Sequence, residues 1–147
     1  MNWSYRNTVL VCCTFAFFSV VTARLVVSPV VPDIVSTFGV SNSAVGLALS
    51  GMWAAYALTQ FPSGILGDRF GERRTILAAV GLTAAASALL ALAPSFPIFA
   101  VLVFCLGIAA GLHYIVATSL LTRNFAQTGR AIWFHGTGAP IAGLLSP

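Results

Sequence analysis

Residues 64–77 read GILGDRFGERRTIL, a short polar segment between two long apolar runs. Gly64 allows the end of the preceding run to approach a neighbour closely, and Gly71 allows the tight reversal that a short loop needs. Asp68 can accept hydrogen bonds from a guanidinium group or from the amino terminus of a helix. The paired arginines at the end of the segment can anchor the next run in the lipid headgroup region. The segment therefore predicts a loop between two antiparallel helices.

The composition is typical of a protein embedded in lipid. Hydrophobic residues make up 59% of the chain and charged residues 7%, whereas about a quarter of the residues of soluble domains are charged. Three acids and seven arginines are too few to cover the surface of a water-soluble globule. We therefore predict an all-α membrane protein, an antiparallel bundle of transmembrane helices whose first partner is the lipid bilayer.

Several other function classes lack the residues they need. The net charge of +4 comes from arginines that are scattered or lie in one short loop, so no basic face for nucleic acid can be drawn. Cys12, Cys13 and Cys105 lie inside apolar runs without the paired spacing of a disulfide framework or a zinc site, and we interpret them as packing residues. The acids fall at membrane surfaces and the two histidines on different helices, so we predict no enzyme, cofactor or metal site.

The hydrophobic runs predict five membrane spans. A helix needs about 20 apolar residues to cross the hydrocarbon, and the breaks place the spans at about residues 8–31, 44–66, 75–93, 96–121 and 131–147. The first run is too long for the core of a signal peptide and is expected to be a retained helix. The loops have about ten residues or fewer, so consecutive helices should be antiparallel neighbours. Residues 1–147 are expected to form one transmembrane domain that is incomplete at its fifth span.

The placement of the arginines predicts the orientation. Cytoplasmic loops retain positive charge. Arginines lie before the first span, between the second and third, and between the fourth and fifth, whereas residues 32–43 and 94–97 contain none. We expect a multi-pass protein of the cell membrane whose amino terminus is cytoplasmic.

Small residues at helical spacing predict close packing of the spans. Gly107 and Gly111 form such a pair on the fourth span. Close backbone approach is a main source of association energy between helices in lipid, so this pair is expected to meet a neighbouring helix.

The segment at residues 64–77 resembles the signature of the major facilitator superfamily, G-x-L-x-D-R-x-G-x-[RK]-[RK]-x-x-L. Eight positions match at fixed spacing, namely Gly64, Leu66, Asp68, Arg69, Gly71, Arg73, Arg74 and Leu77. Residues 29–34 look like the proline-rich outer end of the family's first helix. Residues 136–147 resemble the glycine and proline pattern of its prokaryotic drug and proton antiporters, although Val103 stands where many of these carry an arginine linked to proton movement.

The resemblance implies a fold and a mechanism. Members of the family have two six-helix halves that hold a small solute near the midplane and rock around it. This chain would be part of the amino-terminal half. It would move a small-molecule solute, with proton coupling as one option, by alternating access together with a missing carboxy-terminal half or a second copy. Asp68 would then be expected to meet a helix of the second half.

Five polar residues inside the expected spans are candidates for the substrate pathway. Arg24 costs about 2.5 to 3.5 kcal/mol at mid-membrane on insertion scales, so it is either a cavity-facing cation that holds an anion or a side chain that extends to the outer surface. His113 can titrate near neutral pH or serve as a packing residue, and Tyr114 follows it on the same span. Gln60 is a further candidate on the second span, and His135 on the fifth is a weaker one.

Two other interpretations fit the same sequence. A complete small transporter could work as a homo-oligomer, with a second copy supplying the missing helices. A non-transporting membrane subunit or remnant could instead pack against the helix bundle of a separate partner.

Overall fold

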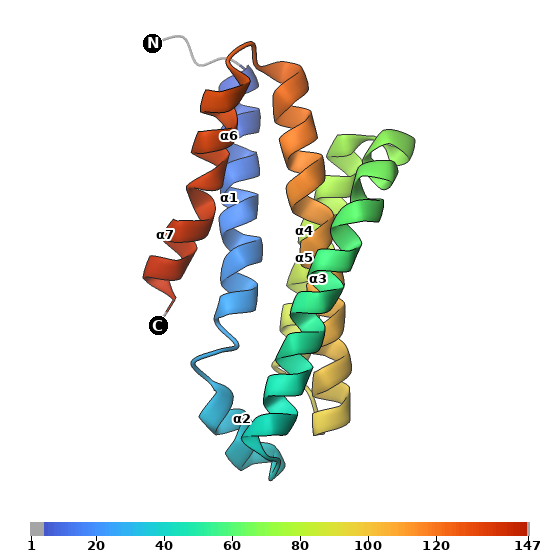
Figure 1. The fold of residues 1–147 in the computed structure, drawn as a ribbon, viewed down its shortest axis with the longest axis vertical. Coiled ribbons are helices and arrows are strands. Elements are labelled where there is room, and N and C mark those ends of the chain that lie inside the picture. Colours follow the sequence, from blue (N-terminus) through green and yellow to red (C-terminus); the bar gives the residue numbers. More distant parts are fainter. Residues whose placement is uncertain (1–4, 147) are drawn as a thin grey trace.

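The computed structural model describes residues 5–146, and its regular elements are all helices. They are α1 (Tyr5–Leu25), α2 (Val31–Phe38), α3 (Asn42–Phe70), α4 (Glu72–Leu90), α5 (Phe96–Asn124), α6 (Thr128–Gly136) and α7 (Gly138–Leu145). The long helices run side by side along one axis, and the short α2 lies across one end (Figure 1). The all-α helical bundle predicted from the sequence is confirmed.

Among the described residues, three helices are long and apolar enough to cross a membrane, by length and composition. They are α1, α4 and α5. Helix α3 has 29 residues but is not one of the three, because serine, tyrosine, threonine and glutamine interrupt its apolar run. Helices α6 and α7 have nine and eight residues and are each too short to cross alone.

The first expected span ends earlier than predicted. Helix α1 stops at Leu25, five residues form turns, and α2 begins at Val31. Pro32 therefore lies in the first turn of α2 instead of ending a helix. The N–H groups of a first turn have no partner within the helix, so proline, which has no N–H, is tolerated there. Gly39 caps the end of α2, with a left-handed φ of 62° and an N–H that donates to the carbonyl of Val35.

Residues 67–74, expected as the loop between the second and third spans, are helical except for Gly71, which corrects that expectation. Helix α3 continues past Pro62 to Phe70, and α4 starts at Glu72. The reversal rests on Gly71 alone, with a φ of 92° that side-chain-bearing residues rarely adopt. The Thr75 hydroxyl donates to the carbonyls of Gly71, at 3.1 Å, and Leu66, at 3.3 Å, and so ties the two helices across the turn.

The expected fifth span is interrupted at Thr137, where α6 ends and α7 begins. Pro140 has no N–H to donate to the carbonyl of Gly136 four residues earlier, so one hydrogen bond of the helical ladder is missing at this point. The neighbouring helical bonds remain, from the Thr137 N–H to the carbonyl of Trp133 and from the Ile141 N–H to that of Thr137, each at 3.2 Å. A glycine on either side of Thr137 lowers the cost of the break.

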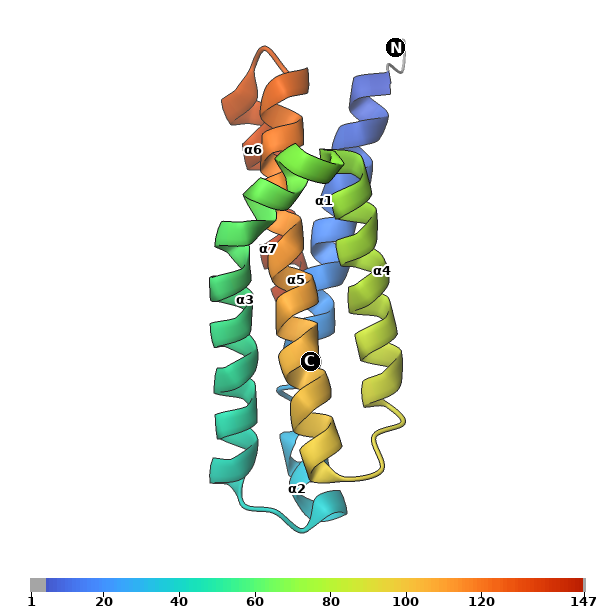
Figure 2. The ribbon, with the colours of Figure 1, turned by 90° about the vertical axis from the view of Figure 1, so that its right-hand side faces the viewer.

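Helix α5 is the centre of the bundle. Figure 2 shows it between α3 and α4, with α1 behind. A Cβ atom at Gly107 would overlap the carbonyl oxygen of Met52, and one at Gly111 would lie 2.5 Å from that of Tyr56. Helices α3 and α5 therefore touch through their backbones at the two positions that the small-residue spacing predicts.

Candidate substrate site

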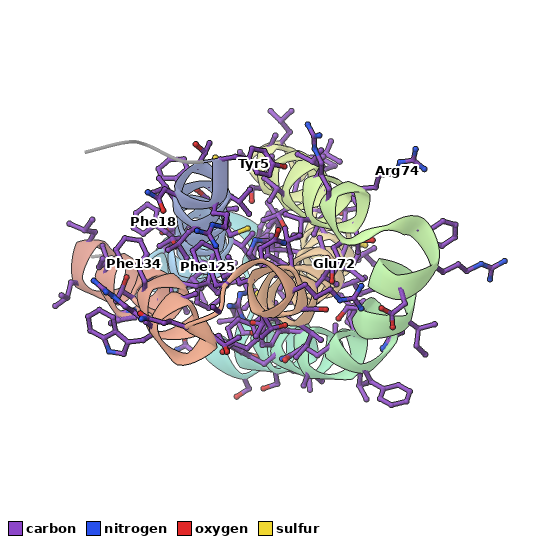
Figure 3. The ribbon with its side chains drawn as sticks, turned by 90° about the horizontal axis from the view of Figure 1, so that it is seen from above. Tyr5, Phe18, Glu72, Arg74, Phe125 and Phe134 are labelled. Atoms are coloured by element: carbon purple, nitrogen blue, oxygen red, sulfur yellow. The ribbon has the colours of Figure 1, made fainter. Side chains whose placement is uncertain are left out.

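The signature residues occupy one end of the bundle, around the α3–α4 turn. Asp68 and Arg69 lie in the last turn of α3, and Glu72 is the first residue of α4. Arg73 and Arg74 are exposed, and Figure 3 shows Arg74 extending away from the helices. Gly64 does not make the close approach expected of it, because a Cβ atom there would lie 3.8 Å from the Ile115 side chain, an ordinary van der Waals distance.

The closest approach in this segment belongs to Gly67, for which no role was predicted. A Cβ atom at Gly67 would lie 3.1 Å from the Val116 side chain of α5. A glycine at this position therefore allows the end of α3 to rest directly on α5.

Asp68 has a partner within the chain. Arg123, in the last turn of α5, donates from Nη2 to Oδ1 of Asp68 at 3.1 Å and places Nε 3.3 Å from Oε1 of Glu72. The Ser119 hydroxyl also donates to Oε1 of Glu72, at 2.7 Å. A guanidinium donor to Asp68 was expected, but not that Arg123 would supply it, because residues 55 positions apart cannot be paired by sequence spacing.

Arg24 is buried at the middle of the bundle. Its residue is 5% exposed, and its guanidinium carbon lies 3.9 Å from the ring centre of Tyr56 and 4.8 Å from that of Trp53. Tyr56 is the fifteenth of the 29 residues of α3. The side chain of Arg24 thus turns inward onto α3 and does not extend to the end of the bundle.

The guanidinium group of Arg24 keeps unused donors. Nε and Nη1 have no hydrogen-bond partner among the described residues, and both ion pairs found there belong to Arg123. Stacking of a desolvated cation on an aromatic ring contributes about 2 kcal/mol, which offsets part of the cost of placing an arginine in the membrane. It does not satisfy the N–H groups, and an anion in this position would do so.

His113 and His135 meet inside the bundle, although they belong to different helices, α5 and α6. Both are completely buried, and their ring centres are 5.8 Å apart with planes inclined by 26°. Phe17 of α1 packs against both, at 6.0 and 4.9 Å, and Tyr114 lies 6.0 Å from His135. None of the four ring nitrogens has a hydrogen-bond partner among the described residues.

Gln60 stays apart from the ring cluster. It is half-buried on α3, one turn beyond Tyr56. Its backbone carbonyl accepts from the Ser63 hydroxyl at 2.6 Å, and its side chain makes no hydrogen bond in the described part of the chain. Tyr56 and Gln60 share a face of α3 because they are four residues apart.

Two surface grooves lie away from these residues. One, of about 330 Å³, runs between α1 and α6–α7 and is lined almost entirely by apolar side chains. These include Phe18 and Phe134, both labelled in Figure 3. The other, of about 420 Å³, lies beside α2 and includes Asp33. Neither groove contains Arg24 or a histidine, so the candidate site is marked by unpartnered polar groups and not by the shape of the surface.

Comparison with known proteins agrees with this architecture. Residues 13–147 match the Major Facilitator Superfamily. The chain is 28% identical over 144 residues to a probable sulfoacetate transporter of Cupriavidus necator, which covers 97% of this chain and 34% of that protein. It is 29% identical over 133 residues to an uncharacterized MFS-type transporter of Mycobacterium tuberculosis, a match that covers 89% of this chain and 23% of that protein. It is 33% identical over 109 residues to a voltage-gated purine nucleotide uniporter of Homo sapiens, a match that covers 69% of this chain and 24% of that protein.

No solved structure matches the chain, and the chain spans about a third or less of the length of these relatives. The family match, however, extends over nearly all of its residues. With the helical bundle and its apolar helices, this match shows that the chain belongs to the major facilitator superfamily of membrane transporters.

Proposed function

We propose that this chain is the amino-terminal part of a secondary transporter that moves a small organic anion across the cell membrane by alternating access. The observation that carries the proposal is Arg24, a buried cation that has two unpartnered nitrogen atoms and no ion pair among residues 5–146. Its guanidinium fork is suited to bidentate binding of a carboxylate, sulfonate or phosphate group.

The depth of Arg24 supports a role in substrate binding. Its partner Tyr56 and the facing Gly111 are the fifteenth and sixteenth of 29 residues in α3 and α5. Carriers built from repeated helical halves bind their substrates near the midplane of the bilayer. Arg24 is in the last turn of α1, but its guanidinium group lies against Tyr56 at the middle of α3, and we propose that this point is near the midplane. A purely structural arginine would gain most near the headgroups.

Two relatives point to the same substrate class. Sulfoacetate and purine nucleotides, which appear in the names of the relatives from Cupriavidus necator and Homo sapiens, are both organic anions. They differ greatly in size and share only their negatively charged groups. A buried arginine is a binding element that both kinds of molecule could use.

Alternating access requires helices beyond those described. We propose that the remaining helices of a longer chain, or a second copy, complete the carrier, and that the α3–α4 turn faces the cytoplasm together with the amino terminus. The Arg123–Asp68 pair lies at that turn, with side chains 63% and 71% exposed. Exposed pairs contribute at most about 1 kcal/mol, so this contact can be exchanged for another during a conformational change at little cost.

Anion binding by the purified chain in lipid nanodiscs tests the proposal. Sulfoacetate is the probe, and quenching of Trp53 fluorescence is the readout, in a background in which Trp3 and Trp133 are phenylalanine. We expect saturable quenching that Arg24→Gln abolishes and that Arg24→Lys weakens, because lysine keeps the charge but loses the fork. Arg130→Gln removes an exposed arginine and is the matched control.

Equal binding by Arg24→Gln and the parent chain would refute the anion site. A flux assay addresses completeness separately. We expect no saturable uptake of sulfoacetate into liposomes that contain this chain alone, and saturable uptake would instead show that copies of the chain assemble into a working carrier.

A further inference from the structure

Two buried imidazole rings without partners require an explanation beyond packing. In an apolar interior an unsatisfied polar group is costly, and here four ring nitrogens from two helices are unsatisfied within one cluster. A pair of phenylalanines would fill the same space without this cost. The two histidines therefore indicate a site at which the ring nitrogens bind an ion.

The geometry argues against a metal ion as that ligand. The ring planes are inclined by only 26°, so the rings stack instead of directing their nitrogens at one point. The described residues contain no group of three or more histidine, cysteine, aspartate or glutamate side chains able to hold a metal. Structural zinc sites use four ligands and catalytic sites three.

We infer that His113 and His135 form one proton-binding site, which takes up a single proton at a time and carries it together with the anion bound at Arg24. The proton enters from the aqueous phase, binds a free ring nitrogen to give one imidazolium, and leaves to the opposite aqueous phase when the anion is released. The inference rests on the proposed function for its anion, whereas the one-proton property of the pair stands independently.

Exclusion of a second proton follows from the ring separation. Two imidazolium charges 5.8 Å apart repel each other enough, at an effective dielectric constant of about 20, to weaken binding of the second proton about a hundredfold. The pair therefore behaves as a single charge carrier over a wide range of pH.

Few other titratable groups face the pair. Helix α5 contributes Tyr114, and α1 contributes the buried Cys13, one turn above Phe17, and Arg24, two turns below it. Helix α6 adds Arg130, which is exposed, and α7 has no titratable side chain. On α4, which packs on α1 and α5, and at the end of α3, the acids Glu72 and Asp68 pair with Arg123. The third acid, Asp33, lies on α2 at the opposite end of the bundle (Figure 1). No carboxylate of the described residues therefore pairs with the histidines.

Arg24 and the histidine pair are connected through one face of α1. Phe17 contacts both histidines and is seven residues before Arg24, which places the two on the same face about 10 Å apart along the helix. An anion at Arg24 therefore lies within reach of the field of the imidazolium. Because an inside-negative potential opposes entry of an anion, a proton bound nearby reduces the charge that must be moved.

The one-proton property can be measured directly, because the chain contains only two histidines. The chain is labelled with ¹⁵N-histidine, purified without a histidine tag and placed in nanodiscs. Imidazole nitrogen signals are then followed by NMR between pH 4 and pH 9. We expect one proton to enter first, and the second either about two pH units lower or not within the range.

Single variants complete this experiment. His113→Gln and His135→Gln should each leave one histidine that titrates in a single step, and Trp133→Phe, an exposed change on α6, should titrate as the parent does. Protonation of both histidines within one pH unit of each other, or no imidazolium signal down to pH 4, would overturn the inference. The parent chain alone decides between these outcomes even if a variant fails to fold.

Coupling to the anion is a separate measurement on the same samples. We expect sulfoacetate to bind severalfold more tightly once the pair is protonated, because the imidazolium attracts the anion. The double variant His113→Gln/His135→Gln should remove this pH dependence while leaving the binding that depends on Arg24. Sulfoacetate binding that is lost in Arg24→Gln but does not change with pH would overturn only the coupling. Sulfoacetate binding that is unchanged in Arg24→Gln would overturn the proposed function but would not affect the conclusion from NMR about the histidine pair.

Discussion

Replacing Gly107 by alanine tests the helix contact that fixes the depth of Arg24. A Cβ atom at this position would overlap the carbonyl oxygen of Met52 and lie 3.0 and 3.1 Å from the carbonyl carbon and Cα of the same residue. These are backbone atoms of α3, so no side chain can rotate to make room. Helices α3 and α5 would have to move apart, and Tyr56, one turn further along α3, would move with them.

The expected magnitude follows from two opposing terms. Overpacking of a close contact costs about 1–3 kcal/mol, and a clash with a helix backbone belongs at the upper end. Alanine gains about 1 kcal/mol over glycine in a helix interior. The net loss is therefore about 2 kcal/mol. Gly81→Ala on α4 is the matched control, because no atom lies within 4 Å of its added Cβ, and it should gain up to about 1 kcal/mol.

The assay is reversible unfolding by SDS in mixed bicelles, followed by far-UV circular dichroism. The two variants should differ by about 3 kcal/mol in the free energy of unfolding, in opposite directions from the parent. Equal stabilities for Gly107→Ala and Gly81→Ala would refute the backbone contact. The assignment of Arg24 to the middle of the bundle would then lose its structural basis.

Three further outcomes are expected from the turns and the charged network. Gly71→Ala should lose about 1–3 kcal/mol in the same unfolding assay, because the φ of 92° is strained for alanine, and a neutral result would contradict the one-residue reversal. Asp68→Asn should cost less than about 1 kcal/mol, because it removes only the exposed pair with Arg123 and leaves Arg123 on Glu72, and a loss of several kcal/mol would show that the Asp68 pair is structural. Pro140→Ala restores a donor for the carbonyl of Gly136, so amide hydrogen exchange around the break should slow, and unchanged exchange would mean that the flanking glycines alone cause the break.

The α3–α4 turn separates what local sequence predicts from what packing adds. The reversal at Gly71 was predictable because glycine adopts the left-handed backbone region that other residues avoid. The helical state of residues 67–70 was not, because glycine and charged residues in succession are typical of a loop. The polar groups are accommodated by contacts with other helices, such as Arg123 on Asp68, which no local pattern reveals.

The sequence alone determined that the chain lies in a membrane, that it is all-helical and that it carries the family signature. Composition, the length of apolar runs and the spacing of a motif can all be read without knowing the fold. Only the tertiary structure decided that Arg24 stacks on Tyr56 and that His113 meets His135. Contacts between helices depend on their rotation, depth and crossing angle, which are set by the fit of side-chain ridges into grooves. That fit is a property of the whole bundle and cannot be predicted from the spacing of residues along one segment.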